Sequence, residues 1–318
     1  MPEEFFAAYD ELSARWGPGA EHLDILTPYG ATRVNCLGGK EAPPLLLLPG
    51  GRDTSAAWFA NAAQWARTHR VLAADLIGDA GRSVPAPGRS IRSVADLGRW
   101  LDALLDGLGV ERTALAGHSY GGWIALHYAL LSPSRTDRLV LLDPTGCFAG
   151  YRPGYLLRAL PMLLAPSPGR VRSFLRWESR GAPLDPGWLR LQEASAGVET
   201  VRPVTGPRPS AAALRALDTP VRILFAGGGR AQDAGRAAKA AAEVLPHAEI
   251  DVLPGVGHHG LQHRAAAEIN ALVGEFVGRP ALHDARPEQP AAPPRRGGSG
   301  RVLSGAVRPR TPVPGRPR

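Results

Sequence analysis

The chain has 318 residues, of which 44% are hydrophobic, and a formal net charge of +8. This length accommodates one large α/β domain with an insertion and a sizeable hydrophobic core. Most of the excess positive charge comes from arginines in residues 280–318, so the rest of the chain is close to neutral and a broad nucleic-acid-binding surface is not expected.

The N-terminal residues are acidic where a secretory signal would be basic. No run in the sequence approaches the ~20 apolar residues of a membrane span. We therefore expect a soluble, cytoplasmic protein with no membrane partner. Residues 3–16 have the apolar spacing of a helix packed on the outside of the core. Residues 23–27 and 31–36 alternate apolar and polar side chains around a Pro-Tyr-Gly turn, which predicts an antiparallel hairpin at the sheet edge.

From Leu45 onward the pattern changes to short apolar runs that alternate with helical segments. Such runs are typical of a parallel sheet that is covered by helices on both faces. The sequence therefore predicts an α/β fold with a mostly parallel, eight-stranded sheet. Its later strands are expected at residues 45–48, 70–75, 113–116, 138–143, 221–226 and 249–253, and its helices at 56–67, 93–108, 123–131, 233–245 and 265–276.

The alternation stops after Asp143, where short helical segments are separated by Pro and Gly. We interpret residues 144–218 as a helical cap inserted after the sixth strand, between two parts of the core at 1–143 and 219–278. Residues 279–318 are rich in Pro, Arg and Gly and predict a disordered tail. Nucleic-acid binding by this tail is an alternative, but no helix has a basic stripe with interleaved aromatic residues, and we expect no nucleic-acid partner.

The segment Gly117-His118-Ser119-Tyr120-Gly121 follows an apolar strand and opens an apolar helix. This strand–turn–helix context is typical of a nucleophile elbow, in which the serine stands exposed at a strained turn. The glycines permit the strand and the helix to approach each other closely. Ser119 is therefore the candidate nucleophile.

A serine nucleophile needs a histidine base and a carboxylate that holds the base. His258 lies in the loop after the last expected strand and is the candidate base, with His259 beside it as the weaker choice. We expect the acid to be Asp233, in the loop after the preceding strand. Asp143, at the end of residues 138–143, is the alternative.

The oxyanion formed by attack on a carbonyl needs two backbone donors. We expect the N–H groups of Tyr120 and Gly51, with Arg52 as the fallback for the second. The glycines at this loop have no phosphate-loop or dinucleotide-binding continuation. Cys36 and Cys147 have no metal-ligand spacing, so neither a metal site nor a disulfide framework is expected.

With these motifs the chain resembles a single-domain, capped α/β-hydrolase of the serine hydrolase type, and is similar to uncharacterised actinobacterial members. The resemblance covers residues 23–277 and is carried by the elbow, by residues 71–83 and by residues 139–144. Two features depart from it. Pro49 stands where a histidine is usual before the oxyanion glycine, and Gly227-Gly228-Gly229 stands where polar residues usually lead to the acid.

The resemblance implies an esterase-like hydrolase that needs no metal or organic cofactor and acts on a small-molecule substrate. Carbon–carbon hydrolase, thioesterase and lactonase activities use the same serine arrangement, and a slow or non-hydrolytic ligand-binding protein of this fold is a further alternative. Aromatic and apolar residues of the expected cap favour an apolar acyl or alkyl group, although for most of them packing of the cap onto the core is the simpler interpretation: Phe148, Tyr151, Tyr155, Met162, Phe174 and Trp177.

Overall fold

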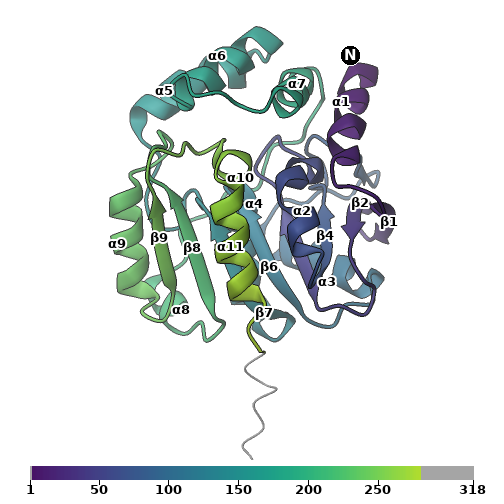
Figure 1. The fold of residues 1–318 in the computed structure, drawn as a ribbon, viewed down its shortest axis with the longest axis vertical. Helices are drawn as coiled ribbons and strands as arrows, with labels where there is room; N and C mark the ends of the chain where they lie inside the picture. The colour runs from purple at the N-terminus through teal and green to yellow at the C-terminus, as the bar shows by residue number, and fades with distance from the viewer. Residues whose placement is uncertain (1, 281–318) are drawn as a thin grey trace, which may run out of the picture. The chain divides into compact units, whose positions relative to one another are not determined.

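A computed structural model of the chain describes residues 2–280. Its centre is one twisted sheet with the strand order β1-β2-β4-β3-β6-β7-β8-β9, and the short β5 pairs with β2 (Figure 1). The strands are β1 (Glu21–Thr27), β2 (Gly30–Leu37), β3 (Pro44–Leu48), β4 (Arg70–Ala74), β5 (Val84–Pro85), β6 (Thr113–His118), β7 (Thr136–Leu142), β8 (Val221–Ala226) and β9 (Glu249–Leu253).

The sheet has an antiparallel edge and a parallel centre. β1 and β2 form the predicted hairpin, and β2 pairs antiparallel with β4. From β4 to β9 every neighbouring pair is parallel. Because parallel strands end at the same edge of a sheet, the loops that follow β3, β6, β7, β8 and β9 meet at that edge. The predicted mostly parallel sheet is confirmed, and the short β5 adds a ninth strand to the eight that were expected.

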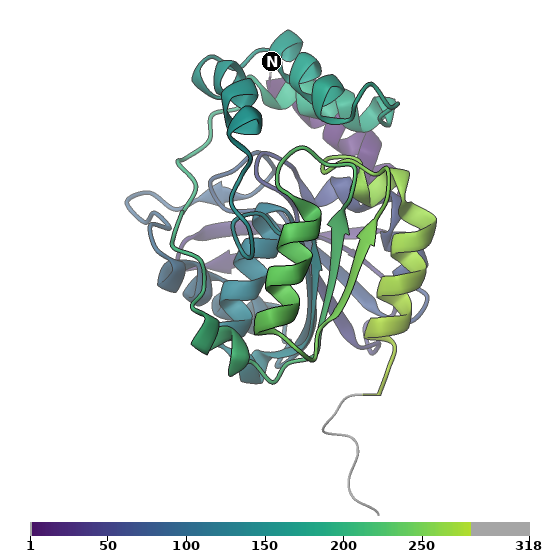
Figure 2. The ribbon, with the colours of Figure 1, turned by 90° about the vertical axis from the view of Figure 1, so that its left-hand side faces the viewer.

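Helices cover both faces of the sheet, as the view along its edge shows (Figure 2). Successive side chains of a strand point to opposite faces. Leu46 and Leu48 of β3 accordingly pack in one hydrophobic cluster and Leu45 and Leu47 in another. The first cluster contains α3 (Val94–Gly107), α4 (Tyr120–Leu131) and α9 (Ala234–Val244), and the second contains α1 (Pro2–Ala14), α2 (Ala62–Trp65), α10 (Leu261–Arg264) and α11 (Ala266–Val277).

The prediction of one continuous helix at residues 56–67 is wrong. The structure has a 3₁₀-helix, η1 (Ser55–Ala60), followed by the single α-helical turn α2. Asn61 separates them with φ −121° and ψ −42°, and its side-chain amide donates to the Gln262 carbonyl oxygen at 3.1 Å. This tertiary contact holds the break in place. A second 3₁₀-helix, η2 (Pro133–Arg135), precedes β7.

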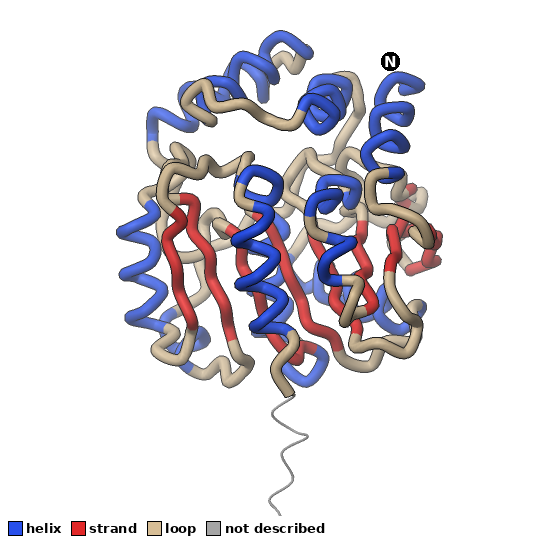
Figure 3. The backbone as a smooth tube through the Cα atoms, viewed as in Figure 1, coloured by secondary structure: helices blue, strands red, loops and turns tan. Residues whose placement is uncertain are grey.

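The segment between β7 and β8 contains four helices. Three of them, α5 (Pro153–Leu164), α6 (Pro168–Glu178) and α7 (Pro186–Ser195), lie beyond the carboxyl ends of the central strands, whereas α8 (Ala211–Arg215) lies at the opposite end of the sheet (Figures 1 and 3). α1 reaches α7, where Arg15 forms a bidentate ion pair with Asp185 at 2.8 and 2.9 Å. α1 therefore helps to position the helices that lie beyond the carboxyl ends of the central strands.

Three features expected from the sequence are the C-terminal tail, the absence of a membrane span and the two separate cysteines. Apart from Arg279 and Pro280, the predicted disordered tail lies outside the described residues. Within residues 2–280, no helix has the length and apolar character needed to cross a bilayer. Cys36 and Cys147 are buried and not joined to each other.

Candidate active site

The turn predicted at Ser119 is present between β6 and α4. Ser119 has φ 53° and ψ −115°, a conformation that costs a non-glycine residue on the order of 1–3 kcal/mol. A Cβ atom on Gly117 would lie 2.3 Å from the Gly121 carbonyl oxygen, and one on Gly121 would lie 2.3 Å from the Leu48 carbonyl oxygen. Only glycine fits at both positions, and the resulting sharp turn presents the Ser119 hydroxyl at the carboxyl edge of the sheet.

Three side chains that are far apart in the sequence form a continuous hydrogen-bonded chain at this edge. The Ser119 Oγ lies 2.8 Å from Nε2 of His258, and the His258 Nδ1 lies 2.6 Å from Oδ2 of Asp143. The side chains of His258 and Asp143 are 1% and 2% exposed. The arrangement can remove a proton from the hydroxyl and stabilise the imidazolium that results.

The expectation that Asp233 holds the histidine is wrong. Asp233 is the N-cap of α9, where its Oδ1 accepts from the Arg236 N–H at 3.0 Å and its Oδ2 pairs with Arg152 at 3.2 Å. Its side chain is 53% exposed. Because its two oxygens are satisfied at the helix start, Asp233 takes no part in the contact to His258. Asp143, the alternative, occupies that place.

Asp143 is held by its own backbone and by Gln232. It follows β7 directly, with φ 40°, and its N–H donates to the Leu224 carbonyl oxygen at 2.8 Å. The buried Gln232 amide donates to Asp143 Oδ1 at 2.9 Å and to the Pro144 carbonyl oxygen at 3.1 Å. Gln232 could not be identified from the sequence, where it is only a polar residue immediately before the N-cap Asp233.

The pKa of the His258 imidazole reflects two opposing effects. Burial alone lowers this pKa, whereas the hydrogen bond that Nδ1 donates to Asp143 and the negative charges of Asp143 and Glu178 raise it. The net result is a pKa above the ordinary histidine value. The imidazolium form is therefore stabilised at this site.

Two further histidines, His118 and His259, lie beside His258, but it is His258 that contacts Ser119. His118 Nε2 lies 3.1 Å from the His258 carbonyl oxygen, and burial holds the pKa of His118 well below its usual value. His259 Nε2 lies 3.3 Å from the Tyr155 hydroxyl, and burial followed by the neighbouring His258 lowers the pKa of His259 to about 4. His259, the weaker candidate base, is directed toward the helices above the site.

The loop after β3 lies beside the serine. A Cβ atom on Gly50 would be 3.4 Å from the Ser119 Cβ, and one on Gly51 would be 3.7 Å from the Tyr120 Cβ. The Arg52 N–H donates to Asp79 Oδ2 at 2.9 Å, so the fallback oxyanion donor is engaged elsewhere. Gly51 and Tyr120 therefore remain the predicted donors.

The same loop is tied to α7 by Asp53. This buried carboxylate accepts from the Trp188 indole at 3.2 Å and from the Gln192 amide at 2.9 Å. Burial raises the pKa of Asp53 to about 7. The helices above the site and the loop beside Ser119 are thus connected through one carboxylate.

The aromatic residues expected in the cap pack mainly against one another. Tyr155, Phe174 and Trp177 form a cluster with ring centroids 5.3–6.3 Å apart. Phe174 also contacts His259 at 5.8 Å between centroids, which brings this cluster to the edge of the site. Phe148 instead packs on Phe225 in the core. The packing role weighed for these residues is therefore observed for several of them.

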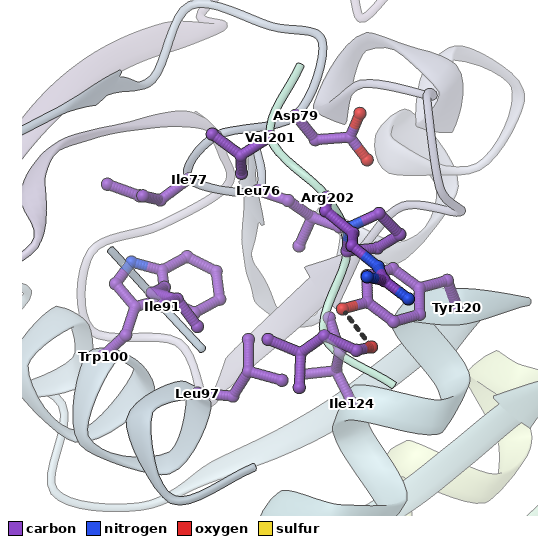
Figure 4. Close-up of a pocket in the computed structure, with 13 residues that line it drawn as sticks. Leu76, Ile77, Asp79, Ile91, Leu97, Trp100, Tyr120, Ile124, Val201 and Arg202 are labelled. Atoms are coloured by element: carbon purple, nitrogen blue, oxygen red, sulfur yellow. Dashed lines mark hydrogen bonds between the residues drawn. The ribbon is translucent and has the colours of Figure 1, made fainter. Parts of the chain in front are cut away.

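A small, mostly apolar cavity is lined by the side chain of Tyr120, the residue after Ser119, but not by Ser119, His258 or Asp143 (Figure 4). The Tyr120 hydroxyl donates to the Val204 carbonyl oxygen at 3.0 Å, and its ring forms one wall. The free space is about 30 Å³, which is enough for only one or two water molecules. The other lining residues are Leu76, Ile77, Gly78, Asp79, Ile91, Leu97, Trp100, Ile124, Val201, Arg202, Pro203 and Val204.

The chain is similar to known proteins over most of its length. The model of the alpha/beta hydrolase family matches residues 45–272. Carboxylesterase YbfK of Bacillus subtilis is 29% identical over 263 residues, which cover 80% of this chain and 87% of the relative.

Two solved structures are similar to the whole described fold. They are the carboxylesterase CesB (YbfK) and the naproxen esterase (carboxylesterase NP), both from Bacillus subtilis, at 26% and 27% identity. Each has a TM-score of 0.80, and each match covers 86% of this chain and 97% of the solved chain. Since the family model spans most of the sequence, this chain belongs to the alpha/beta hydrolase family.

Proposed function

We propose that the protein is a carboxylesterase-like serine hydrolase in which Ser119, His258 and Asp143 form the catalytic triad. The observation that carries this proposal is the continuous hydrogen-bonded chain from the Ser119 hydroxyl to the buried Asp143 carboxylate. The similarity to carboxylesterases over most of the chain supports an ester as the substrate.

In the first half of the reaction, Ser119 Oγ attacks the ester carbonyl carbon while His258 Nε2 takes the hydroxyl proton. The tetrahedral intermediate carries its negative charge on the former carbonyl oxygen. The Gly51 and Tyr120 N–H groups are the proposed donors to this oxygen. When the intermediate collapses, the C–O bond to the alcohol breaks and the imidazolium returns its proton to the alcohol.

In the second half, water attacks the acyl-enzyme. His258 accepts a proton from this water, and the new tetrahedral intermediate collapses to release the carboxylic acid. As the bond between the acyl carbon and Ser119 Oγ breaks in this collapse, the imidazolium gives the proton taken from water to Ser119 Oγ. Asp143 accepts the Nδ1 proton and so holds the imidazole in the tautomer that presents an unprotonated Nε2 to the serine.

We further propose that residues 144–218 act as the cap and that the substrate carries an apolar acyl or alkyl group. The cavity beside Tyr120 is apolar on most sides and adjoins the proposed oxyanion donor. Because its free space is about 30 Å³, far below the several hundred Å³ of a drug-sized site, we expect short apolar groups to be preferred.

Labelling with a fluorophosphonate probe tests the proposal. The probe reacts with an activated serine, so the wild-type protein should be labelled and Ser119→Ala should not. A panel of p-nitrophenyl esters, thioesters and lactones should then show the fastest turnover on short-chain esters. No labelling of the wild type would refute the proposed function and favour a ligand-binding protein, whereas unchanged labelling of Ser119→Ala would refute Ser119 as the nucleophile.

A further inference from the structure

Glu178, the last residue of α6, is a buried carboxylate that the reaction described above does not use. It is 0% exposed. Among the described residues, its hydrogen-bond donors are backbone N–H groups: Oε1 accepts from His258 at 2.9 Å and from Arg230 at 3.3 Å, and Oε2 accepts from His259 at 3.3 Å. A buried charge is costly unless it is well solvated by such donors, so its retention calls for an explanation.

These contacts join a helix above the site to two loops at the sheet edge. Arg230 lies in the loop after β8, and His258 and His259 lie in the loop after β9. A Cβ atom on Gly257 would be 3.2 Å from Glu178 Oε2, so the carboxylate packs directly against the backbone that precedes His258. The Arg180 guanidinium, two residues further on, donates to the Gly228 carbonyl oxygen at 3.0 Å.

We propose that Glu178 is a positioning residue for His258: it orients the backbone of the histidine loop and places a second negative charge beside the imidazolium formed during catalysis. This inference depends on the proposed role of His258 as the base. In the described part of the chain, Glu178 forms no hydrogen bond with the serine or with the proposed oxyanion donors, and its proposed effect on the reaction passes through the loop that carries His258.

The charges around His258 favour this interpretation. The titratable groups that face it are Asp143 after β7, His118 from β6, His259 from its own loop and Glu178 from α6. Burial keeps the pKa values of His118 and His259 below the ordinary value, so both are neutral near pH 7. The carboxylates of Asp143 and Glu178 are thus the groups that stabilise a positive charge on His258.

The test compares Glu178→Gln with the wild type by measuring kcat/KM for a p-nitrophenyl ester across about pH 5 to 9. The glutamine keeps an acceptor oxygen but loses the charge. We expect the plateau to fall about tenfold, because the histidine loop is held less firmly. We also expect the midpoint of the acidic limb to move to lower pH by about half a unit, because the imidazolium loses a stabilising charge.

Two variants sharpen the comparison. Glu178→Asp retains the charge on a shorter side chain, so its midpoint should return toward the wild-type value while the plateau stays reduced. Glu193→Gln is the matched control. Glu193 is also a largely buried carboxylate above the site, but it pairs with Arg172 at 2.6 and 2.5 Å and is not among the described hydrogen-bond partners of His258. Both its plateau and its midpoint should match the wild type.

Several results would contradict the proposed role of Glu178. A folded Glu178→Gln protein with the wild-type midpoint overturns the electrostatic role, even if the plateau falls. If Glu178→Gln does not fold, Glu178→Asp carries the test, and a wild-type plateau in that variant overturns the positioning role. Ser119→Ala is assayed in parallel: residual activity there refutes the proposed function itself, whereas an inactive Ser119→Ala with a wild-type Glu178→Gln profile refutes only the role of Glu178.

Discussion

Replacing Asp143 by asparagine tests which aspartate serves the histidine. In the wild type, Asp143 Oδ2 accepts the His258 Nδ1 proton at 2.6 Å, while Oδ1 accepts from the Gln232 amide at 2.9 Å. An asparagine has one oxygen and one NH₂ group. If its oxygen continues to accept from Gln232, its NH₂ group faces His258 Nδ1. The imidazole then carries its proton on Nε2, where it can no longer accept the Ser119 proton.

The expected loss follows from this tautomer. A carboxylate-to-amide change in a serine triad that leaves the geometry intact lowers kcat by about 10⁴-fold, which corresponds to roughly 5 kcal/mol of transition-state stabilisation. We therefore expect Asp143→Asn to lower kcat by about this amount. Adding Gln232→Ala to Asp143→Asn frees the amide to turn its oxygen toward His258, and we expect part of the activity to return.

Steady-state hydrolysis of a short-chain p-nitrophenyl ester, with the fold monitored by circular dichroism, measures these effects. Asp233→Asn is the control. Asparagine is as good an N-cap as aspartate, and the lost pair with the half-exposed Arg152 is worth at most about 1 kcal/mol of stability. Its kcat should match the wild type. Substantial activity in Asp143→Asn together with a large loss in Asp233→Asn would refute the reasoning.

Three further predictions concern stability and substrate size. Gly121→Ala should fail to fold or lose several kcal/mol of unfolding free energy in denaturant titrations, because its Cβ would meet a backbone oxygen at 2.3 Å, whereas Gly154→Ala, with no atom within 4 Å, should be near wild type. The folded pKa of Asp53 is about 7, which is above the unfolded value near 4. Its contribution to the free energy of unfolding therefore falls as the pH rises between those two values. When the free energy of unfolding is measured against pH, Asp53→Asn should lack this fall, which is at most on the order of 4 kcal/mol. Val201→Ala should open the cavity at Tyr120 and so raise the ratio of hexanoate to acetate ester turnover, whereas Val201→Trp should fill the cavity and lower this ratio. The same ratio in both variants and the wild type would show that the cavity is not part of the substrate site.

Much of the fold could be predicted from the sequence because it is encoded locally. Continuous apolar runs such as Leu45–Leu48 mark buried parallel strands, and the paired glycines around Ser119 mark a turn that a Cβ atom would block. These features depend on residues that are neighbours in the chain. The break at Asn61 could not be predicted in this way, because its amide contacts Gln262 from a distant part of the sequence.

The sequence by itself determined the α/β fold, the turn at Ser119 and the choice of His258 over His259 as the histidine that meets it. Only the tertiary structure decided which aspartate completes the chain of hydrogen bonds. Asp143 and Asp233 both follow strands that end at the same edge, so spacing cannot separate them. What separates them is the direction of each side chain: Asp233 turns back to cap α9, while the backbone of Asp143 and the Gln232 amide direct its carboxylate to His258. The role proposed for Glu178 could likewise not be predicted from the sequence, because its partners are backbone groups that only the folded chain brings together.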